Sequence, residues 1–262
     1  MHATAQDGRA SNGIFYRVVG AGEPLLLLHG IMVSGAMFDP LVALLSDRFR
    51  MLIPDLRGHG KSGTLPGPYD VAALAADLDT ACSEAGFERC AVMGYSHGGA
   101  VAQQVARDRP ERVTKLFLCC TYACNASTLR ERIEGEVAGA LLMLLSPATL
   151  AKIVFRASKP KSGQVGLTPQ QTDRLRAIMG SNRARPMRGA VRGLVDFDSR
   201  PWLPKISAPT RVIGGTDDHA VPRHHFDALL RGIPNAEGTL IDGADHKLIW
   251  THTRQLADLI GT

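Results

Sequence analysis

The chain has 262 residues, of which 45% are hydrophobic and 21% charged, and its formal net charge at pH 7 is +5. These proportions are typical of a globular protein with one large core, and they exclude a disordered or fibrous chain. The basic excess is concentrated in residues 122–200, which hold 13 Lys and Arg against 6 Asp and Glu. We interpret it as a solvated face, with attraction of anionic substrates as the alternative.

No targeting or membrane-spanning segment is predicted. Residues 1–7 lack the basic stretch and following apolar stretch of a signal peptide. The longest apolar run, residues 138–145, is too short to cross a membrane. The five cysteines lack paired C-x-x-C spacing, which favours a cytoplasmic protein without a disulfide framework or zinc site. No basic arm with interleaved aromatic residues indicates binding to nucleic acid.

Strands and helices are predicted to alternate along most of the chain. The strands expected in the first half are Gly13–Val19, Pro24–Leu28, Met51–Ile53, Cys90–Tyr95 and Val113–Cys120, and the helices are Ala36–Asp47, Val71–Ala85 (capped by Asp70) and Gly98–Arg109. Near the end come the strands Pro209–Ile213 and Gly238–Ile241 and the helices Pro222–Leu230 and Lys247–Ile260. This alternation predicts an α/β fold, a mostly parallel sheet with helices on both faces.

The alternation stops in the middle of the chain. Four helices without an intervening strand are expected there, at Thr128–Leu145, Pro147–Arg156, Pro169–Met179 and Arg185–Val195. We therefore predict a core made of residues 1–121 and 209–262 and a helical cap insertion made of residues 122–208.

A nucleophile elbow is predicted where one strand runs directly into a helix. The segment Gly94-Tyr95-Ser96-His97-Gly98 matches G-x-S-x-G, in which a sharp strand-to-helix turn exposes the serine hydroxyl. Glycines are expected on either side because the strand and helix backbones come so close that a Cβ atom would collide. On the pattern alone, a glycine-rich turn is the alternative.

The loop after Met51–Ile53 contains partial matches to two nucleotide-binding motifs. Residues 58–63 fit G-x-G-x-x-G, but residues 64–68 separate them from the next helix, which the dinucleotide motif must open directly. Residues 60–62, Gly-Lys-Ser, imitate the end of a P-loop, but Asp55 stands where its first glycine is required. We reject both motifs and predict a compact turn held by its glycines.

A base and an acid for Ser96 are expected at two later strand ends. A serine hydroxyl is a poor nucleophile at neutral pH, so it needs a base, and the base needs an orienting acid. Asp217 and Asp218 follow the next-to-last predicted strand, and His246 follows the last one. Because the carboxyl ends of parallel strands lie at one edge of a sheet, these side chains are expected to meet Ser96 there.

These motifs resemble the α/β-hydrolase fold family, in its capped subgroup of small bacterial esterases and lactonases similar to 3-oxoadipate enol-lactonases. The landmarks, spread over nearly the whole chain, are His29-Gly30, Asp55–Ser62, the elbow, Gly215-x-x-Asp218-x-x-x-Pro222 and Gly243-x-x-His246. The order Ser, Asp, His is also that of the family. The resemblance implies an eight-stranded type of sheet, a catalytic triad of Ser96, Asp218 and His246, and an oxyanion hole from the backbone amides of Ile31 and His97. Asp217 is the minor alternative for the acid.

The implied activity is that of a serine hydrolase that cleaves a small-molecule carboxylic ester or lactone through a covalent acyl-enzyme. No metal or organic cofactor is implied. A carbon–carbon bond hydrolase, an acyltransferase and a cofactor-free perhydrolase use the same triad and stay open as alternatives, and a non-catalytic ligand-binding receptor is a remote one. The particular ester or lactone and the oligomeric state are left open.

The sequence also suggests a role or a degree of exposure for several other side chains. His29 and His59 are expected to brace loops, while the imidazole of His97 either lines the pocket or packs. Four further histidines lack the spacing of a metal site and are expected to be exposed: His219, His224, His225 and His252. Residues that either pack or border the site are Cys119, Cys120, Phe38, Tyr95 and Trp250.

Overall fold

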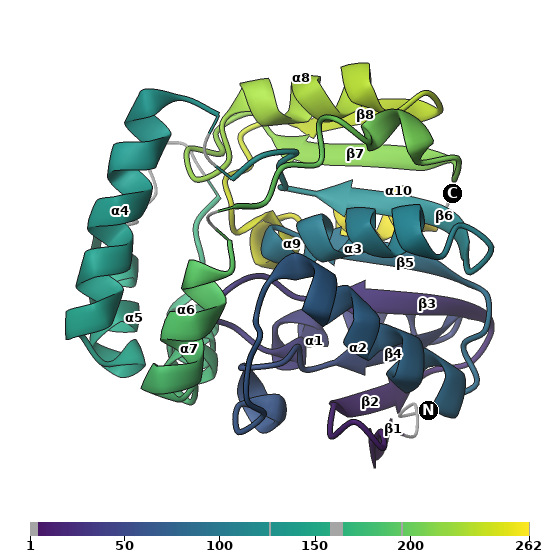
Figure 1. Cartoon of the computed structure of the whole chain (residues 1–262), viewed down its shortest axis with the longest axis horizontal. Helices are drawn as coiled ribbons and strands as arrows, with labels where there is room; N and C mark the ends of the chain where they lie inside the picture. The colour runs from purple at the N-terminus through teal and green to yellow at the C-terminus, as the bar shows by residue number, and fades with distance from the viewer. Residues whose placement is uncertain (1–4, 126, 158–164, 195, 262) are drawn as a thin grey trace.

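An eight-stranded sheet lies at the centre of the computed structural model, which describes residues 5–125, 127–157, 165–194 and 196–261 (Figure 1). The strand order is β1-β2-β4-β3-β5-β6-β7-β8. The strands are β1 (Ala5–Arg9), β2 (Phe15–Val19), β3 (Glu23–Leu28), β4 (Phe49–Pro54), β5 (Cys90–Tyr95), β6 (Val113–Cys119), β7 (Thr210–Gly215) and β8 (Ala236–Ile241). Only the β1–β2 and β2–β4 pairs are antiparallel in the described residues. The predicted α/β fold with a mostly parallel sheet is confirmed.

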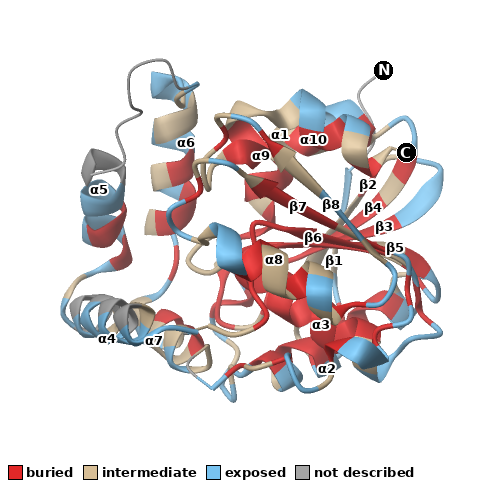
Figure 2. Cartoon of the chain, turned by 90° about the horizontal axis from the view of Figure 1, so that it is seen from above, coloured by how far each residue is buried: buried red, intermediate tan, exposed pale blue. Residues whose placement is uncertain are grey.

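Helices cover both faces of the sheet, and the central strands and the helices beside them are largely made of buried residues (Figure 2). The buried hydrophobic residues form two large clusters, one on each face of the sheet. One face carries α1 (Asp39–Leu45), α9 (Leu248–Thr251) and α10 (Thr253–Ile260); the other carries α2 (Val71–Glu84), α3 (His97–Asp108) and α8 (Arg223–Gly232). In β3, Leu26 and Leu28 pack toward α2 and α3, whereas the alternate residues Leu25 and Leu27 pack toward α1. Burial on both faces explains why this strand is a continuous apolar run.

The sequence prediction differs from the structure mainly at the ends of the chain. β1 is missed because its residues, mostly exposed at the edge of the sheet, show no apolar alternation. The prediction of a single helix at the end of the chain is wrong, because the segment divides into α9 and α10 at His252, where ψ is 35°. The first predicted helix begins with a 3₁₀ turn, Gly35–Phe38, before α1. Asp70 caps α2 as predicted, accepting a hydrogen bond from the Ala73 amide at 2.9 Å.

In the described residues, four α-helices stand between β6 and β7, beside the carboxyl ends of the parallel strands (Figure 1). They are α4 (Leu129–Leu144), α5 (Pro147–Ala157), α6 (Pro169–Gly180) and α7 (Ala184–Arg192). Val195, the predicted end of the last helix, lies outside the described residues. Neither these helices nor any others in the described ranges have the length and apolar composition needed to cross a bilayer.

Candidate active site

Ser96 occupies a strained turn between β5 and α3. Its φ of 53° and ψ of −121° are a combination that residues with a side chain rarely adopt. A Cβ on Gly94 would lie 2.3 Å from the carbonyl oxygen of Gly98, and a Cβ on Gly98 would lie 2.1 Å from that of Leu28. The reason predicted for the two glycines, close approach of backbones, is therefore confirmed.

The end of β6 holds this turn in place. The Ser96 amide donates to the carbonyl oxygen of Cys119 at 2.9 Å, and the carbonyl oxygen of Ser96 accepts the Thr121 hydroxyl at 2.6 Å. The Gly99 amide donates to the same carbonyl oxygen at 2.8 Å. Sequence reasoning missed Thr121, whose only signal is its position just after a buried strand.

The structure brings together the side chains of Ser96, Asp218 and His246, which lie up to 150 residues apart in sequence. His246 Nε2 is 3.1 Å from Ser96 Oγ, and His246 Nδ1 is 2.8 Å from Asp218 Oδ2. The loops after β7 and β8 pack tightly against each other, since a Cβ on Gly215 would lie 2.1 Å from the carbonyl oxygen of Ala244. It is Asp218, rather than Asp217, whose carboxylate faces the imidazole.

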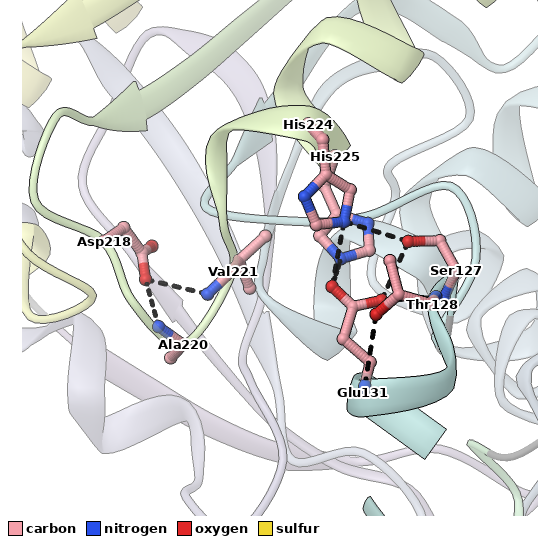
Figure 3. Close-up of polar contacts among 8 residues, drawn as sticks. All are labelled: Ser127, Thr128, Glu131, Asp218, Ala220, Val221, His224 and His225. Atoms are coloured by element: carbon pink, nitrogen blue, oxygen red, sulfur yellow. Dashed lines mark hydrogen bonds and ion pairs between the residues drawn. The ribbon is translucent and has the colours of Figure 1, made fainter. Parts of the chain in front are cut away.

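Backbone amides fix the second oxygen of the Asp218 carboxylate. Asp218 Oδ1 accepts hydrogen bonds from the amides of Ala220 and Val221, both at 2.9 Å (Figure 3). Burial raises the pKa of Asp218, but the charge and hydrogen bond of His246 outweigh burial and leave this pKa below its ordinary value. Burial lowers the pKa of His246, and the Asp218 charge and hydrogen bond more than reverse this, so that it lies above its ordinary value. The pair therefore stabilises a protonated imidazole.

Two backbone amides border Ser96. His97 follows it as the first residue of α3, and Gly30 is so near that a Cβ there would lie 3.3 Å from the Ser96 Cβ, which places the loop of Ile31 beside the serine. Among the hydrogen bonds of the described residues, none has the amide of Ile31 or His97 as its donor. Both N–H groups are therefore available to an oxygen atom of a ligand.

Three histidines near the site are buried and neutral. The Leu56 amide donates to His29 Nε2 at 2.9 Å and His29 Nδ1 donates to the Gly30 carbonyl at 2.8 Å, so His29 braces two loops as predicted. His59 contacts the Arg57 carbonyl within its own loop at 3.1 Å. Burial lowers the pKa of His29 to about 4 and that of His59 to about 3. Burial also lowers the pKa of His97 to about 3, and its Nδ1 lies 3.5 Å from the Tyr122 hydroxyl.

Cys120 borders the triad side chains, whereas Cys119 is buried within the sheet. The Cys120 sulfur and the nearest ligand atoms of Asp218 and His246 all lie within 4.8 Å of one another. Cys120 also has a φ of 47°, which is unusual for a residue with a side chain. Three aromatic residues were candidates for bordering the site. The ring centroid of Tyr95 lies 5.4 Å from that of His246, while Phe38 and Trp250 are buried in the core.

The prediction that the remaining histidines are exposed is wrong for His225. Only 5% of this residue is exposed, because it packs against Glu131 of α4 and the ring of Tyr122. His252 is half-buried, whereas His219 and His224 are exposed as predicted. No sequence pattern singles out Glu131, which lies 94 residues before its partner His225.

The comparisons with known proteins agree with this architecture. The family model for the alpha/beta hydrolase fold matches residues 23–253, and the chain belongs to this family. The magnesium-chelatase 30 kDa subunit of Rhodobacter capsulatus is 32% identical in an alignment 241 residues long, which covers 85% of this chain and 80% of that protein. A thermophilic esterase from Thermogutta terrifontis superposes with a TM-score of 0.81 at 26% identity, over 100% of this chain and 97% of the esterase.

A further solved structure, the enol-lactonase from Burkholderia xenovorans LB400, shares the fold. Its TM-score is 0.83 at 23% identity, and the match covers 98% of each chain. The predicted resemblance to bacterial esterases and lactonases of the α/β-hydrolase type is thus confirmed at the level of the family, and these relationships support a hydrolase.

Proposed function

We propose that the protein hydrolyses a carboxylic ester or lactone of a small molecule through a covalent acyl-enzyme. The observation that carries the proposal is the continuous chain of hydrogen bonds from Ser96 Oγ to His246 Nε2, at 3.1 Å, and from His246 Nδ1 to Asp218 Oδ2, at 2.8 Å. A hydroxyl, an imidazole and a carboxylate in this geometry can activate a nucleophile. The 26% identity with a solved esterase supports the same class of reaction.

In the first half of the reaction, Ser96 Oγ attacks the carbonyl carbon while its proton passes to Nε2 of neutral His246. Asp218 accepts the hydrogen bond from Nδ1 and stabilises the imidazolium. The negative oxygen of the tetrahedral intermediate is bound by the amides of Ile31 and His97, and losing one such donor in comparable sites costs ~3–4 kcal/mol. The carbon–oxygen bond then breaks as His246 protonates the leaving alcohol, which in a lactone stays attached to the acyl group.

In the second half, water replaces the alcohol. His246 takes a proton from a water molecule, and the resulting hydroxide attacks the acyl carbon. When this tetrahedral intermediate collapses, the acid leaves and the proton returns to Ser96 Oγ. The three side chains, the two backbone amides and a water molecule supply every group in both steps, so the proposed reaction requires no cofactor.

We further propose that residues 122–208 act as a cap over a core made of residues 1–121 and 209–262. Asn182, just after α6, supports this assignment because it joins two loops near Ser96. Its Nδ2 donates to the Met32 carbonyl at 2.8 Å, and its Oδ1 accepts the Gly60 amide at 2.9 Å. The basic excess of this segment includes Lys159 and Lys161, which lie outside the described residues.

A fluorophosphonate probe tests the nucleophile. We expect one equivalent to react with the wild-type chain, the modified peptide to contain Ser96, and Ser96→Ala to remain unlabelled. A folded wild-type chain that resists the probe would overturn the enzyme proposal in favour of a receptor. A panel of nitrophenyl esters and lactones, with and without a substrate carboxylate, then tests the bond that is cleaved and the attraction of anionic substrates.

A further inference from the structure

Glu131 at the start of α4 meets two adjacent histidines at the start of α8 (Figure 3). Its Oε1 atom lies 2.8 Å from His224 Nε2 and 3.1 Å from His225 Nε2. The Nε2 atoms of the two histidines therefore converge on one carboxylate oxygen. The centroids of the two imidazole rings lie 4.2 Å apart. The triad of the proposed reaction does not use any of these three side chains.

The two oxygens of Glu131 have different surroundings. Oε2 accepts hydrogen bonds from the Ser127 amide and hydroxyl, both at 2.8 Å, and from the Thr128 amide at 3.1 Å. In return, Thr128 Oγ1 accepts the Glu131 amide at 3.2 Å, which completes a capping box. Oε2 is therefore occupied in holding the helix start, and Oε1 points at the histidines.

The donor types suit a cation. Glu131 supplies a carboxylate oxygen, and the two groups that face it are imidazole nitrogens rather than Lys or Arg side chains. An ionised carboxylate and a neutral imidazole are the forms that bind metals. Arg223, the nearest cation along α8, is paired with Asp227 at 2.8 Å.

We propose that Glu131, His224 and His225 bind a divalent transition-metal ion of the Zn²⁺ type. Two imidazole nitrogens and one carboxylate oxygen are a common donor set for such ions. Ligand atoms about a tetrahedral zinc ion lie ~3.3 Å apart, from bond lengths of ~2.0–2.1 Å. Small outward movements of the two imidazoles from Oε1, now at 2.8 and 3.1 Å, make room for the ion. A water molecule or the Ser127 hydroxyl, 2.9 Å from His224 Nε2, completes the coordination.

The ion would tie the region between β6 and β7 to the loop that carries Asp218. Glu131 belongs to α4, whereas His224 and His225 lie just beyond the turn whose amides, those of Ala220 and Val221, hold the Asp218 carboxylate. Metal binding releases the direct contacts between Glu131 and the histidines and replaces them with stronger bonds through the ion. The site is thus structural, and it stabilises the folded chain without taking part in ester cleavage.

Calorimetric titration of the untagged full-length chain with Zn²⁺, together with thermal unfolding, tests the site. We expect one ion per chain and a rise in Tm on addition of the metal. Glu131→Gln and His224→Ala should each weaken Zn²⁺ binding at least ~10-fold. Glutamine preserves the capping box, and 44% of the His224 side chain is exposed, so both variants are expected to fold. Glu136→Gln, on an exposed position of α4, is the matched control and should bind like the wild type.

Three outcomes would overturn the proposal. The first is a wild-type chain that binds no Zn²⁺ at micromolar concentration. The second is unchanged affinity in Glu131→Gln and His224→Ala, each verified as folded by circular dichroism. The third is binding that survives in both variants but disappears in Cys120→Ser, which would place the ion at Cys120, Asp218 and His246, where the ligand atoms also lie within 4.8 Å.

Discussion

The hydroxyl of Thr121 donates a hydrogen bond to the carbonyl oxygen of Ser96 at 2.6 Å, joining the ends of two adjacent parallel strands. The bond lies directly at the residue whose backbone is strained, with a φ of 53°. Strain of this kind persists only where the surrounding structure holds it in place. Thr121 is therefore a positioning residue for the elbow rather than a reacting group.

Replacing Thr121 by valine tests this role, because valine keeps the shape and loses the hydroxyl. We expect the free energy of unfolding to fall by ~1 kcal/mol, the net value of a typical buried hydrogen bond. Thr121→Ser, which retains the donor, should lose less stability and keep a higher kcat than the valine variant. Urea unfolding and ester hydrolysis measure the two effects, and a valine variant as stable and active as wild type would contradict the role.

Asp218 and its neighbour Asp217 provide a matched pair of variants. Asp218→Asn removes the charge that faces His246 Nδ1, at 2.8 Å, and favours the wrong imidazole tautomer. Comparable substitutions lower kcat by ~10⁴. Asp217→Asn should keep kcat within about threefold of the wild type, a difference of less than ~1 kcal/mol in the barrier. If steady-state kinetics showed the larger loss in the Asp217 variant, the assignment of the acid would be reversed.

The pH dependence of hydrolysis follows from the environment of His246. The base must be neutral, and the Asp218 charge raises its pKa, so activity is present above that raised pKa and is lost as the pH falls through it. The midpoint of kcat/KM should accordingly lie above ~6.5, the ordinary histidine value. The residual activity of Asp218→Asn should show a lower midpoint. A profile that stays flat from pH 8 down to pH 4.5 would exclude His246 as the base.

Two glycine-to-alanine substitutions should change the stability of the folded chain in opposite directions. A Cβ on Gly98 would lie 2.1 Å from the Leu28 carbonyl oxygen, so Gly98→Ala should destabilise the fold by ~3 kcal/mol or more. Gly139 lies inside α4. Apart from its chain neighbours and its own helix backbone, no atom of the described residues lies within 4 Å of its Cβ position, and Gly139→Ala should stabilise the chain by ~0.5–1 kcal/mol. Chemical denaturation measures the free energy of unfolding of both variants. Equal effects would show that backbone crowding at the elbow is not the reason for a glycine at position 98.

Features that depend on near neighbours in the chain were predictable from the sequence. The leucine run of β3, the glycines around Ser96 and the Asp70 cap of α2 follow from local backbone geometry and from an apolar pattern that is continuous along the chain. The order of Ser96, Asp218 and His246 was predictable as well, because each follows a recognisable strand and parallel strands end at one edge.

Tertiary structure alone decided the features that join distant segments. β1 is an edge strand with exposed residues, so no apolar pattern marks it. Thr121 reaches Ser96 across neighbouring strands, and Glu131 meets His225 across 94 residues of chain. The strand ends and the elbow could be located from residue order alone, since those depend on local spacing. Whether a given histidine is exposed or bound to a carboxylate was decided only by how the helices pack, because burial and partner are properties of the assembled fold.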